Sequence, residues 1–335
     1  MVEKTIQNRP NSNSSQISPV LLECIEEVDE LNEVATGASL EIIQLVPGRF
    51  QGCFSHIQFP DSSLHQNQIN LPSRGRGVAS ATRWSFIMFS SRGKGTFNAF
   101  SLDPGILIAY PPNSEFEGTI MGEAVFCDWV LTVTEDALAD VYFALAGRDL
   151  TILKSHVKCL KPALSTIKLL QDFVIDLLLA AQRRPEVFND RMIRQRLQRQ
   201  LIEWLARTLM SADHKLRYEV PPHSSHWQLV RSVESFLDTN LARDLSLAEL
   251  CSAAGVSERT LRRAFDNVLG VGPLQYLKAF RLNRAHCELK QAASNKNSVA
   301  KVAMHWGLKH LGRFSQEYRH FFGEMPSDTL RRNKT

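Results

Sequence analysis

The stretch LSLAELCSAAGVSERTLRRAFDNVLGVGP, residues 245–273, returns about 52 residues later as NSVAKVAMHWGLKHLGRFSQEYRHFFGEMP, residues 297–326. Each copy starts with two apolar residues three positions apart, reaches a glycine five residues later, and continues as apolar-x3-aromatic-x4-Gly-x2-Pro. The matched positions are Leu247, Leu250, Gly255, Leu261, Phe265, Gly270 and Pro273 in the first copy, and Val299, Val302, Gly307, Phe314, Tyr318, Gly323 and Pro326 in the second. Such a repeat indicates one supersecondary unit used twice.

Each copy predicts a helix, a tight turn and a second helix. Gly255 allows the left-handed conformation that a sharp helix exit needs, and Ser257 is a favourable N-cap for the next helix. Leu261 and Phe265 are four residues apart, so they share one buried face. This is the helix-turn-helix arrangement, whose second helix enters the major groove of DNA.

The segment between the copies, PLQYLKAFRLNRAHCELKQA (residues 273–292), has apolar residues at the spacing of one amphipathic helix. Roughly 19 residues at ~1.5 Å each give a rod about 28 Å long. Major grooves on one face of DNA recur every ~34 Å. We expect the rod to hold two recognition helices one turn apart on the same side of the duplex.

Basic charge is concentrated in the same part of the chain. From residue 226 onward, 17 Lys and Arg stand against 10 Asp and Glu, whereas the net charge of the whole chain is only +4. A basic segment inside a weakly charged protein is typical of a polyanion partner, here double-stranded DNA.

Residues 226–332 resemble the AraC/XylS family of bacterial transcription regulators. The family's RL-x-x-A-x-x-x-L stretch is matched by Arg281, Leu282, Ala285 and Leu289, and its terminal F-G-x-x-P by Phe322, Gly323 and Pro326. Its usual Gly-Phe pair is Gly307-Leu308 here, one apolar residue replacing another. The resemblance implies that DNA faces Glu258, Arg259, Arg262 and Arg263 in the first unit, and His310, Leu311, Gly312, Arg313 and Gln316 in the second.

Side-chain chemistry assigns roles within this surface. Arg259 and Arg313 are predicted to contact guanine, because a guanidinium binds O6 and N7 bidentately, and Gln316 suits adenine. Lys301, Lys309 and Arg263 are predicted phosphate contacts, which position the protein without specifying sequence. The alternative for each arginine is an ordinary surface ion pair.

The N-terminal half predicts strands. Residues 80–135 are short β-rich runs, such as RWSFIMFSS (83–91) and AVFCDWVLTV (124–133), punctuated by Gly and Pro, and residues 40–59 add two more strands. We expect an antiparallel β-barrel or sandwich. SRGRG (73–77) and SRGKG (91–95) are predicted to be basic turns rather than phosphate loops, because neither opens a helix after a strand.

Two amphipathic stripes follow, at residues 162–181 and 189–210, and predict a helical hairpin that packs on the strands or forms a dimer interface. The fold class is therefore α+β. The predicted organisation is a regulatory and dimerisation domain at residues 1–215, a linker at 216–225, and an all-α DNA-binding domain with two helix-turn-helix units at 226–335.

This N-terminal architecture resembles the regulatory half of AraC-like activators. A closer resemblance, to ethanolamine-operon regulators, rests on Tyr110, Pro111, Ser114, Glu115, Phe116 and Glu117, together with residues 269–290. We expect an activator that has RNA polymerase as a partner and that forms a homodimer through the apolar stripes at residues 162–210. The expected effector is a small molecule. The carboxylates of Glu115 and Glu117 favour an amine, as the resemblance does, and a bulkier iron chelate or cofactor is the competing effector. Predicted effector-binding residues are Trp84, Phe86, Phe97, Glu115 and Trp129. The alternative role of the four aromatic residues is ordinary barrel core.

Other functions lack their motifs. No nucleophile elbow or clustered metal ligands are evident, and His56 and His65 read as isolated, so we predict no catalytic residue, no metal and no cofactor. No run of about 18 apolar residues predicts a membrane span. The six cysteines include no C-x-x-C pair, which favours reduced thiols and a cytoplasmic protein. The alternative function is a DNA-binding regulator whose N-terminal half only dimerises or binds a partner protein.

Overall fold

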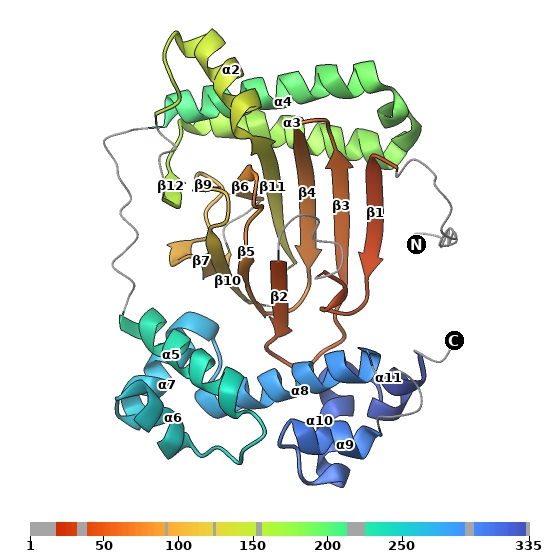
Figure 1. Cartoon of the computed structure of the whole chain (residues 1–335), viewed down its shortest axis with the longest axis vertical. Coiled ribbons are helices and arrows are strands. Elements are labelled where there is room, and N and C mark those ends of the chain that lie inside the picture. The colour runs from red at the N-terminus through yellow and green to blue at the C-terminus, as the bar shows by residue number, and fades with distance from the viewer. Residues whose placement is uncertain are drawn as a thin grey trace.

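The computed structural model describes residues 18–31, 39–90, 93–122, 125–151, 156–212, 225–291 and 298–332. A β-rich N-terminal part carries helices on one side and a helical C-terminal part on the other (Figure 1). The predicted linker, residues 216–225, lies outside the described residues except for Ser225. The proposed domain boundaries therefore stay predictions.

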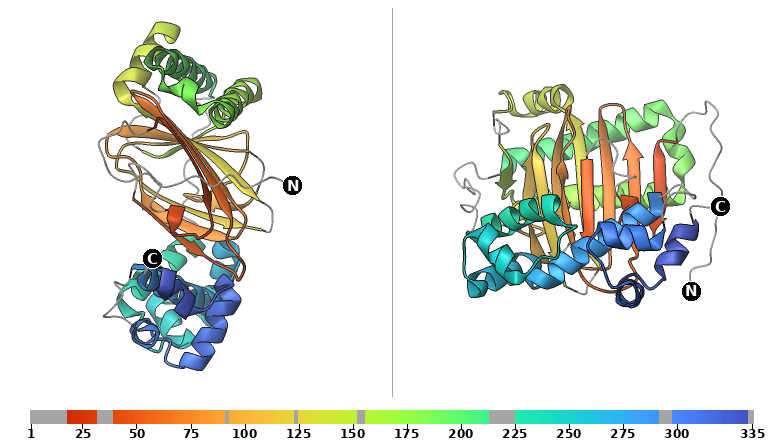
Figure 2. Two further views of the ribbon diagram at one scale, coloured as in Figure 1. Left: turned by 90° about the vertical axis from the view of Figure 1, so that its right-hand side faces the viewer. Right: turned by 60° about the horizontal axis from the view of Figure 1, so that its bottom comes forward.

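The N-terminal part is a sandwich of two antiparallel sheets, seen edge-on in the left view of Figure 2. In the order of pairing, the first sheet contains β1 (Val20–Ile25), β3 (Gly52–Gln58), β4 (Ser62–Ile69), β11 (Phe126–Thr134), β6 (Arg83–Phe89), β9 (Leu107–Tyr110) and β12 (Lys158–Leu160). The second contains β2 (Ser39–Gln44), β5 (Ser73–Val78), β10 (Glu115–Met121), β7 (Lys94–Phe97) and β8 (Phe100–Ser101). The expectation of a sandwich is confirmed, and the described strands form no closed barrel.

Helices cover the outer face of the seven-stranded sheet (Figures 1 and 2). They are α2 (Glu135–Ala146), α3 (Leu164–Arg183), the 3₁₀ helix η1 (Pro185–Asn189) and α4 (Arg191–Ser211). Asp190 begins α4 by accepting hydrogen bonds from the backbone N–H groups of Met192 and Ile193. The predicted hairpin of α3 and α4 is confirmed. Its inward stripes pack on apolar residues of the sheet, such as Trp84 and Leu131.

The C-terminal part contains the predicted repeat. Its helices are α5 (Ser225–Asn240), α6 (Leu247–Ala254), α7 (Glu258–Leu269), α8 (Pro273–Gln291), α9 (Val299–His305), α10 (Leu311–Phe322) and α11 (Pro326–Arg332). The turns after α6 and α9 use Gly255 and Gly307 at φ 66° and 71°, and the Ser257 hydroxyl caps α7. The 19-residue helix α8 connects the two units as the predicted rod (Figure 1). The two helix-turn-helix units are thus confirmed.

The sequence SRGRG is not the basic turn that we predicted. It lies within β5, which pairs with β2 on one side and β10 on the other. Because side chains alternate along a strand, Ser73 and Gly75 face the other sheet while Arg74 and Arg76 point toward the C-terminal helices. For SRGKG, Ser91 and Arg92 lie outside the described residues, and Lys94 and Gly95 begin β7.

The Arg74 side chain joins the two parts of the molecule. It is 1% exposed, and its Nε and Nη2 each lie 3.1 Å from a carboxylate oxygen of Glu234 on α5. Its Nη2 also donates to Glu117 on β10 at 3.0 Å, and its guanidinium lies 4.6 Å from the ring centre of Trp227. Tyr276 on α8 donates a 2.7 Å hydrogen bond to Glu234. Burial alone would raise the pKa of Glu234, but Arg74 and Tyr276 bring it below its ordinary value.

We predict that Glu234→Gln destabilises the protein by roughly 3–5 kcal/mol, because it leaves a buried guanidinium short of negative charge. Urea unfolding followed by tryptophan fluorescence measures this, since Trp227 lies under Arg74. The matched control is Glu203→Gln, which breaks the exposed ion pair with Arg199 and should cost about 1 kcal/mol or less. Equal small losses in both variants would show that Arg74 does not hold the two parts together.

Candidate DNA interface and effector cavity

The first recognition helix presents all of its predicted DNA-contact residues to solvent. Glu258, Arg259, Arg262 and Arg263 are exposed on α7, whereas Leu261 and its neighbours on the other face are buried. Glu258 and Arg262 pair with each other at 2.8 Å, one helical turn apart. Arg262 thus makes, through its Nε, the surface ion pair that is the alternative to a base contact, and its contact with DNA stays a prediction.

The second recognition helix is arranged differently. Lys309, His310, Leu311, Gly312, Arg313 and Gln316 are all exposed at the start of α10 or just before it. Arg313 pairs with Glu317 at 2.9 Å, and Lys309 lies 3.8 Å from Asp244. His310 makes no capping hydrogen bond, unlike Ser257 in the first unit. The structure brings the predicted residues to two exposed helices, and their DNA contacts stay predictions.

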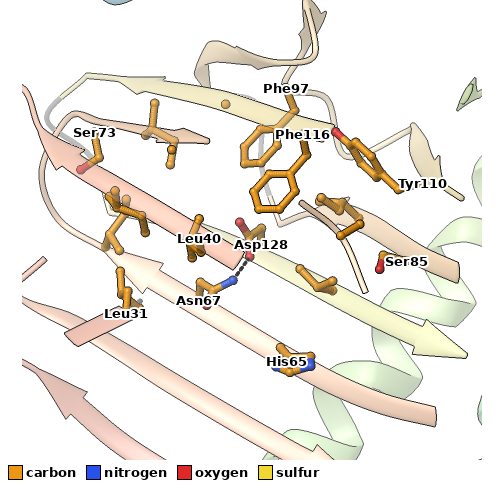
Figure 3. A pocket seen from close by; sticks show the side chains of 18 of the residues that line it. Leu31, Leu40, His65, Asn67, Ser73, Ser85, Phe97, Tyr110, Phe116 and Asp128 are labelled. Carbon is orange, nitrogen blue, oxygen red and sulfur yellow. Dashed lines mark hydrogen bonds between the residues drawn. The ribbon is translucent and has the colours of Figure 1, made fainter. Parts of the chain in front are cut away.

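A cavity of about 160 Å³ lies between the two sheets (Figure 3). Its wall is mostly apolar and comes from both sheets, including Leu40, Ile42, Phe54, Ile87, Phe97 and Phe116. An engineered cavity of about 150 Å³ binds benzene. The space therefore suits a ligand built around one ring.

Asp128 is the one carboxylic acid among the described residues that line this cavity, and no lysine or arginine is among them. It projects from β11 among the lining side chains, where the Asn67 amide donates a 2.7 Å hydrogen bond to its Oδ1 (Figure 3). Burial raises the pKa of Asp128 to about 7, even though hydrogen bonds from Asn67 act in the opposite direction. The sequence signal for this group was the single charged residue of the strand FCDWVLTV, and the sequence analysis missed it.

His56 and His65 are not isolated, contrary to the sequence reading. They are directly opposed on β3 and β4, with their Nδ1 atoms 3.2 Å apart. Burial lowers the pKa of His65 to about 3 and that of His56 to about 4, helped by nearby positive charge. Both rings are therefore neutral at physiological pH, and His65 lines the cavity as an uncharged polar group.

Of the five predicted effector-binding residues, the structure places only Phe97 at the cavity. Trp84, Phe86 and Trp129 are buried on the opposite face of the seven-stranded sheet, within the core that α3 and α4 complete. Their alternative role, ordinary core, is the one they have. Glu115 is exposed and pairs with Arg231 on α5 at 3.1 Å, outside the cavity. For Trp84, Phe86 and Trp129 the prediction is wrong, because the sequence shows the alternation of a strand without showing which face looks inward. Glu115 instead lines a separate pocket between β10 and α5, and its role stays a prediction.

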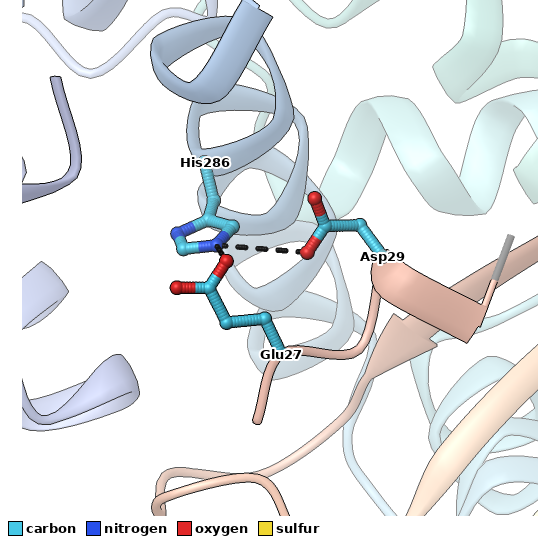
Figure 4. A group of neighbouring side chains, drawn as sticks. All are labelled: Glu27, Asp29 and His286. Atoms are coloured by element: carbon cyan, nitrogen blue, oxygen red, sulfur yellow. Dashed lines mark ion pairs between the residues drawn. The ribbon is translucent and has the colours of Figure 1, made fainter. Parts of the chain in front are cut away.

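A cluster of Glu27, Asp29 and His286 lies where the N-terminal and C-terminal parts of the molecule meet. The Nε2 atom of His286 on α8 lies 3.4 Å from Glu27 and 3.7 Å from Asp29, which belong to the segment after β1 (Figure 4). The donor types suit a metal ion. However, the Lys290 ammonium already lies 2.5 Å from Glu27 and 2.9 Å from Asp29. Lys290 thus supplies the cation that these carboxylates need, and we interpret the cluster as a second interdomain ion-pair group.

Comparison with known proteins bears on the C-terminal part. Residues 250–332 match the family model described as a helix-turn-helix domain. The XylDLEGF operon transcriptional activator of Pseudomonas putida is 38% identical over 102 residues, which are 30% of this chain and 32% of that protein. The probable thc operon regulatory protein of Rhodococcus erythropolis is 34% identical over 124 residues, 37% of each chain. This chain therefore matches about a third of the length of these curated relatives.

A solved structure adds a similar match. A probable AraC family transcriptional regulator from Rhodopseudomonas palustris CGA009 is 35% identical, covers 32% of this chain and 97% of that one, and has a TM-score of 0.29. The C-terminal part is thus a DNA-binding domain of the helix-turn-helix class. Residues 250–332 are thus similar to the helix-turn-helix part of these operon regulators, in agreement with the resemblance to the AraC/XylS family. Neither of these two names mentions ethanolamine, so that closer resemblance stays a prediction.

Among the described helices, none combines the length and the apolar character that crossing a lipid bilayer requires.

We predict that Arg259→Ala and Arg313→Ala each weaken binding to the specific operator by about 1–3 kcal/mol, because each removes a bidentate guanine contact. Lys309→Ala should instead weaken binding to all DNA similarly and flatten its salt dependence, as expected for a phosphate contact. Fluorescence anisotropy with operator and random duplexes at several salt concentrations separates the two effects. If the arginine variants lose the same factor on both duplexes, these arginines do not read bases.

Proposed function

We propose that this protein is a sequence-specific transcription activator that binds double-stranded DNA and responds to a small molecule held between its two sheets. The curated relatives named above as operon regulators support the activator role. An activator requires RNA polymerase as a partner. The proposed compartment is the bacterial cytoplasm, where the protein would encounter both DNA and RNA polymerase. We assign the protein no catalytic step.

The observation that carries the effector role is the position of the cavity. On β5, Ser73 and Gly75 line it, whereas Arg74 and Arg76 bind α5 through Glu234 and Asp238. The two neighbouring strands also contribute to the cavity wall, through Ile42 on β2 and Phe116 on β10. Any ligand that moves these strands also moves the residues that hold the DNA-binding helices. A ligand shifts an arrangement only if it binds one form better than another, and this shared backbone gives a route to such a difference.

The test uses the full-length protein and an operator selected from a random DNA pool. Small molecules that raise its melting temperature should also change operator affinity, because binding stabilises one arrangement by mass action. In Arg76→Ala, which removes the bidentate contact to Asp238 without touching the cavity, the same molecules should still raise the melting temperature but change operator affinity less. Arg199→Ala, on the outer surface of α4, is the control. Stabilising molecules that leave wild-type operator affinity unchanged would favour the alternative, in which the N-terminal half only dimerises or binds a partner protein.

We also propose that the protein is a homodimer that associates through residues 162–210. The α3 and α4 helices expose an unusual number of large apolar side chains: Leu164, Leu169, Ile175, Leu179, Met192 and Ile193. Six exposed large apolar side chains thus belong to one helical hairpin, and exposed apolar surface that gathers in one region marks an interaction site.

Replacing Ile175 and Leu179 with glutamate puts two charges one helical turn apart on this surface and should convert the dimer to a monomer. Sedimentation velocity at micromolar concentration measures the change. The control is Gln228→Glu with Ser232→Glu, which adds the same spacing of charge to the exposed face of α5 and should leave the dimer intact. A wild-type protein that sediments as a monomer contradicts the proposal.

A further inference from the structure

The cavity between the two sheets contains an acidic side chain and no lysine or arginine among its described lining residues. Its apolar wall encloses Asp128, and the described lining residues offer no positive side chain to balance it. None of the ion pairs among the described residues includes Asp128, whose carboxylate accepts a hydrogen bond from the neutral amide of Asn67. A buried carboxyl group without a cation is costly to ionise. The cavity therefore lacks one positive charge.

Several of the other polar groups at the cavity are already engaged. The His65 ring bonds to the Ser63 hydroxyl, which bonds in turn to Thr132. Ser73 donates to the carbonyl of Leu71. Because the Asn67 Nδ2 donates to Asp128, its own Oδ1 remains as an acceptor beside the carboxylate. Asp128 and Asn67 together thus offer acceptors to a group that carries several N–H donors.

We propose that the effector is a small apolar amine, with a one-ring or similarly sized hydrocarbon body among the aromatic side chains and its ammonium group on Asp128 and Asn67. This inference rests on the proposed effector function and names its ligand class. An ammonium supplies both the missing charge and the hydrogen bonds, and a charge-assisted bond is stronger than a neutral one. A carboxylate ligand instead places a second negative charge beside Asp128, which is unfavourable. Glu115 and Glu117, the carboxylates that the sequence favoured for binding an amine, do not line this cavity.

The test compares three ligands of nearly the same shape on the full-length protein: benzylamine, benzyl alcohol and benzoate. Calorimetry at pH 8 should give an affinity for benzylamine at least tenfold higher than for benzyl alcohol, and no measurable binding of benzoate. Asp128→Asn should reduce benzylamine to the level of benzyl alcohol and leave benzyl alcohol unchanged, which also shows that the variant folds with its cavity intact. Asp172→Asn, on the exposed face of α3, is the matched control and should change nothing.

The pH dependence gives an independent readout. With a pKa of about 7 for Asp128, the affinity for benzylamine should fall about tenfold from pH 8 to pH 6, because the carboxyl must lose its proton to bind the ammonium. The other titratable groups facing the cavity keep their charge in this range: His65 is neutral because its pKa is about 3, and burial raises the pKa of Tyr110. In Asp128→Asn this slope should vanish.

Two outcomes overturn the inference in different ways. If benzoate binds as tightly as benzylamine, or if Asp128→Asn leaves the preference for benzylamine unchanged, the ligand class is wrong while the effector role of the cavity stands. If none of the three binds at millimolar concentration, the cavity is not an effector site of this size, and the effector part of the proposed function fails with it. DNA binding by the recognition helices is measured separately and survives either result.

Discussion

The ion pair between Arg74 and Glu234 is the constraint on which the arrangement of the two parts depends. A guanidinium that is 1% exposed cannot lose its carboxylates without a large desolvation cost. One of these carboxylates, Glu117, lies on the sandwich and the other, Glu234, on the first helix of the DNA-binding part. Apolar contacts also cross the boundary between the two parts, because Ile43 and Leu45 of the N-terminal part pack into a core made mainly by α5, α7 and α8. The parts are therefore held by a buried charge network set within shared apolar contacts.

The composition of β5 explains how one strand serves two surfaces. Its inward positions are Ser73 and Gly75, small residues that leave room for the cavity; its outward positions are arginines that reach the helices. A larger residue at Gly75 would begin to fill the space between the sheets, since an added Cβ there already lies 3.9 Å from Leu40 and Ile42. The alternation of small and basic residues is thus a physical requirement of a strand with a cavity on one face and an ion-pair interface on the other.

The sequence predicted what depends on local geometry and missed what depends on distant partners. Gly255, Ser257 and the spacing of Leu261 and Phe265 specify a helix-turn-helix unit within a few residues, so both units were found. SRGRG has the composition of a turn, but it forms a strand because it pairs with β2 and β10. Its arginines are also bound by carboxylates about 160 residues away in the sequence. Likewise, alternation along RWSFIMF is visible in the sequence, but only the packing of α3 and α4 shows that Trp84 and Phe86 face the helices rather than the cavity.

The docked arrangement leaves the DNA-reading surface open. The predicted contact residues on α7 and α10 are all exposed although the two parts are joined through α5 and α8. Covering of the recognition helices therefore cannot be how the N-terminal part controls DNA binding in this state. What the interface does fix is the rod: Asn283 on α8 exchanges two hydrogen bonds with the backbone of Gln44 on β2, and Arg284 pairs with Glu41 on the same strand. Since α8 also sets the spacing of the two units, a ligand that displaces β2 would act on the placement of the recognition helices along the duplex, and DNA affinity is sensitive to that placement because both units must meet successive major grooves.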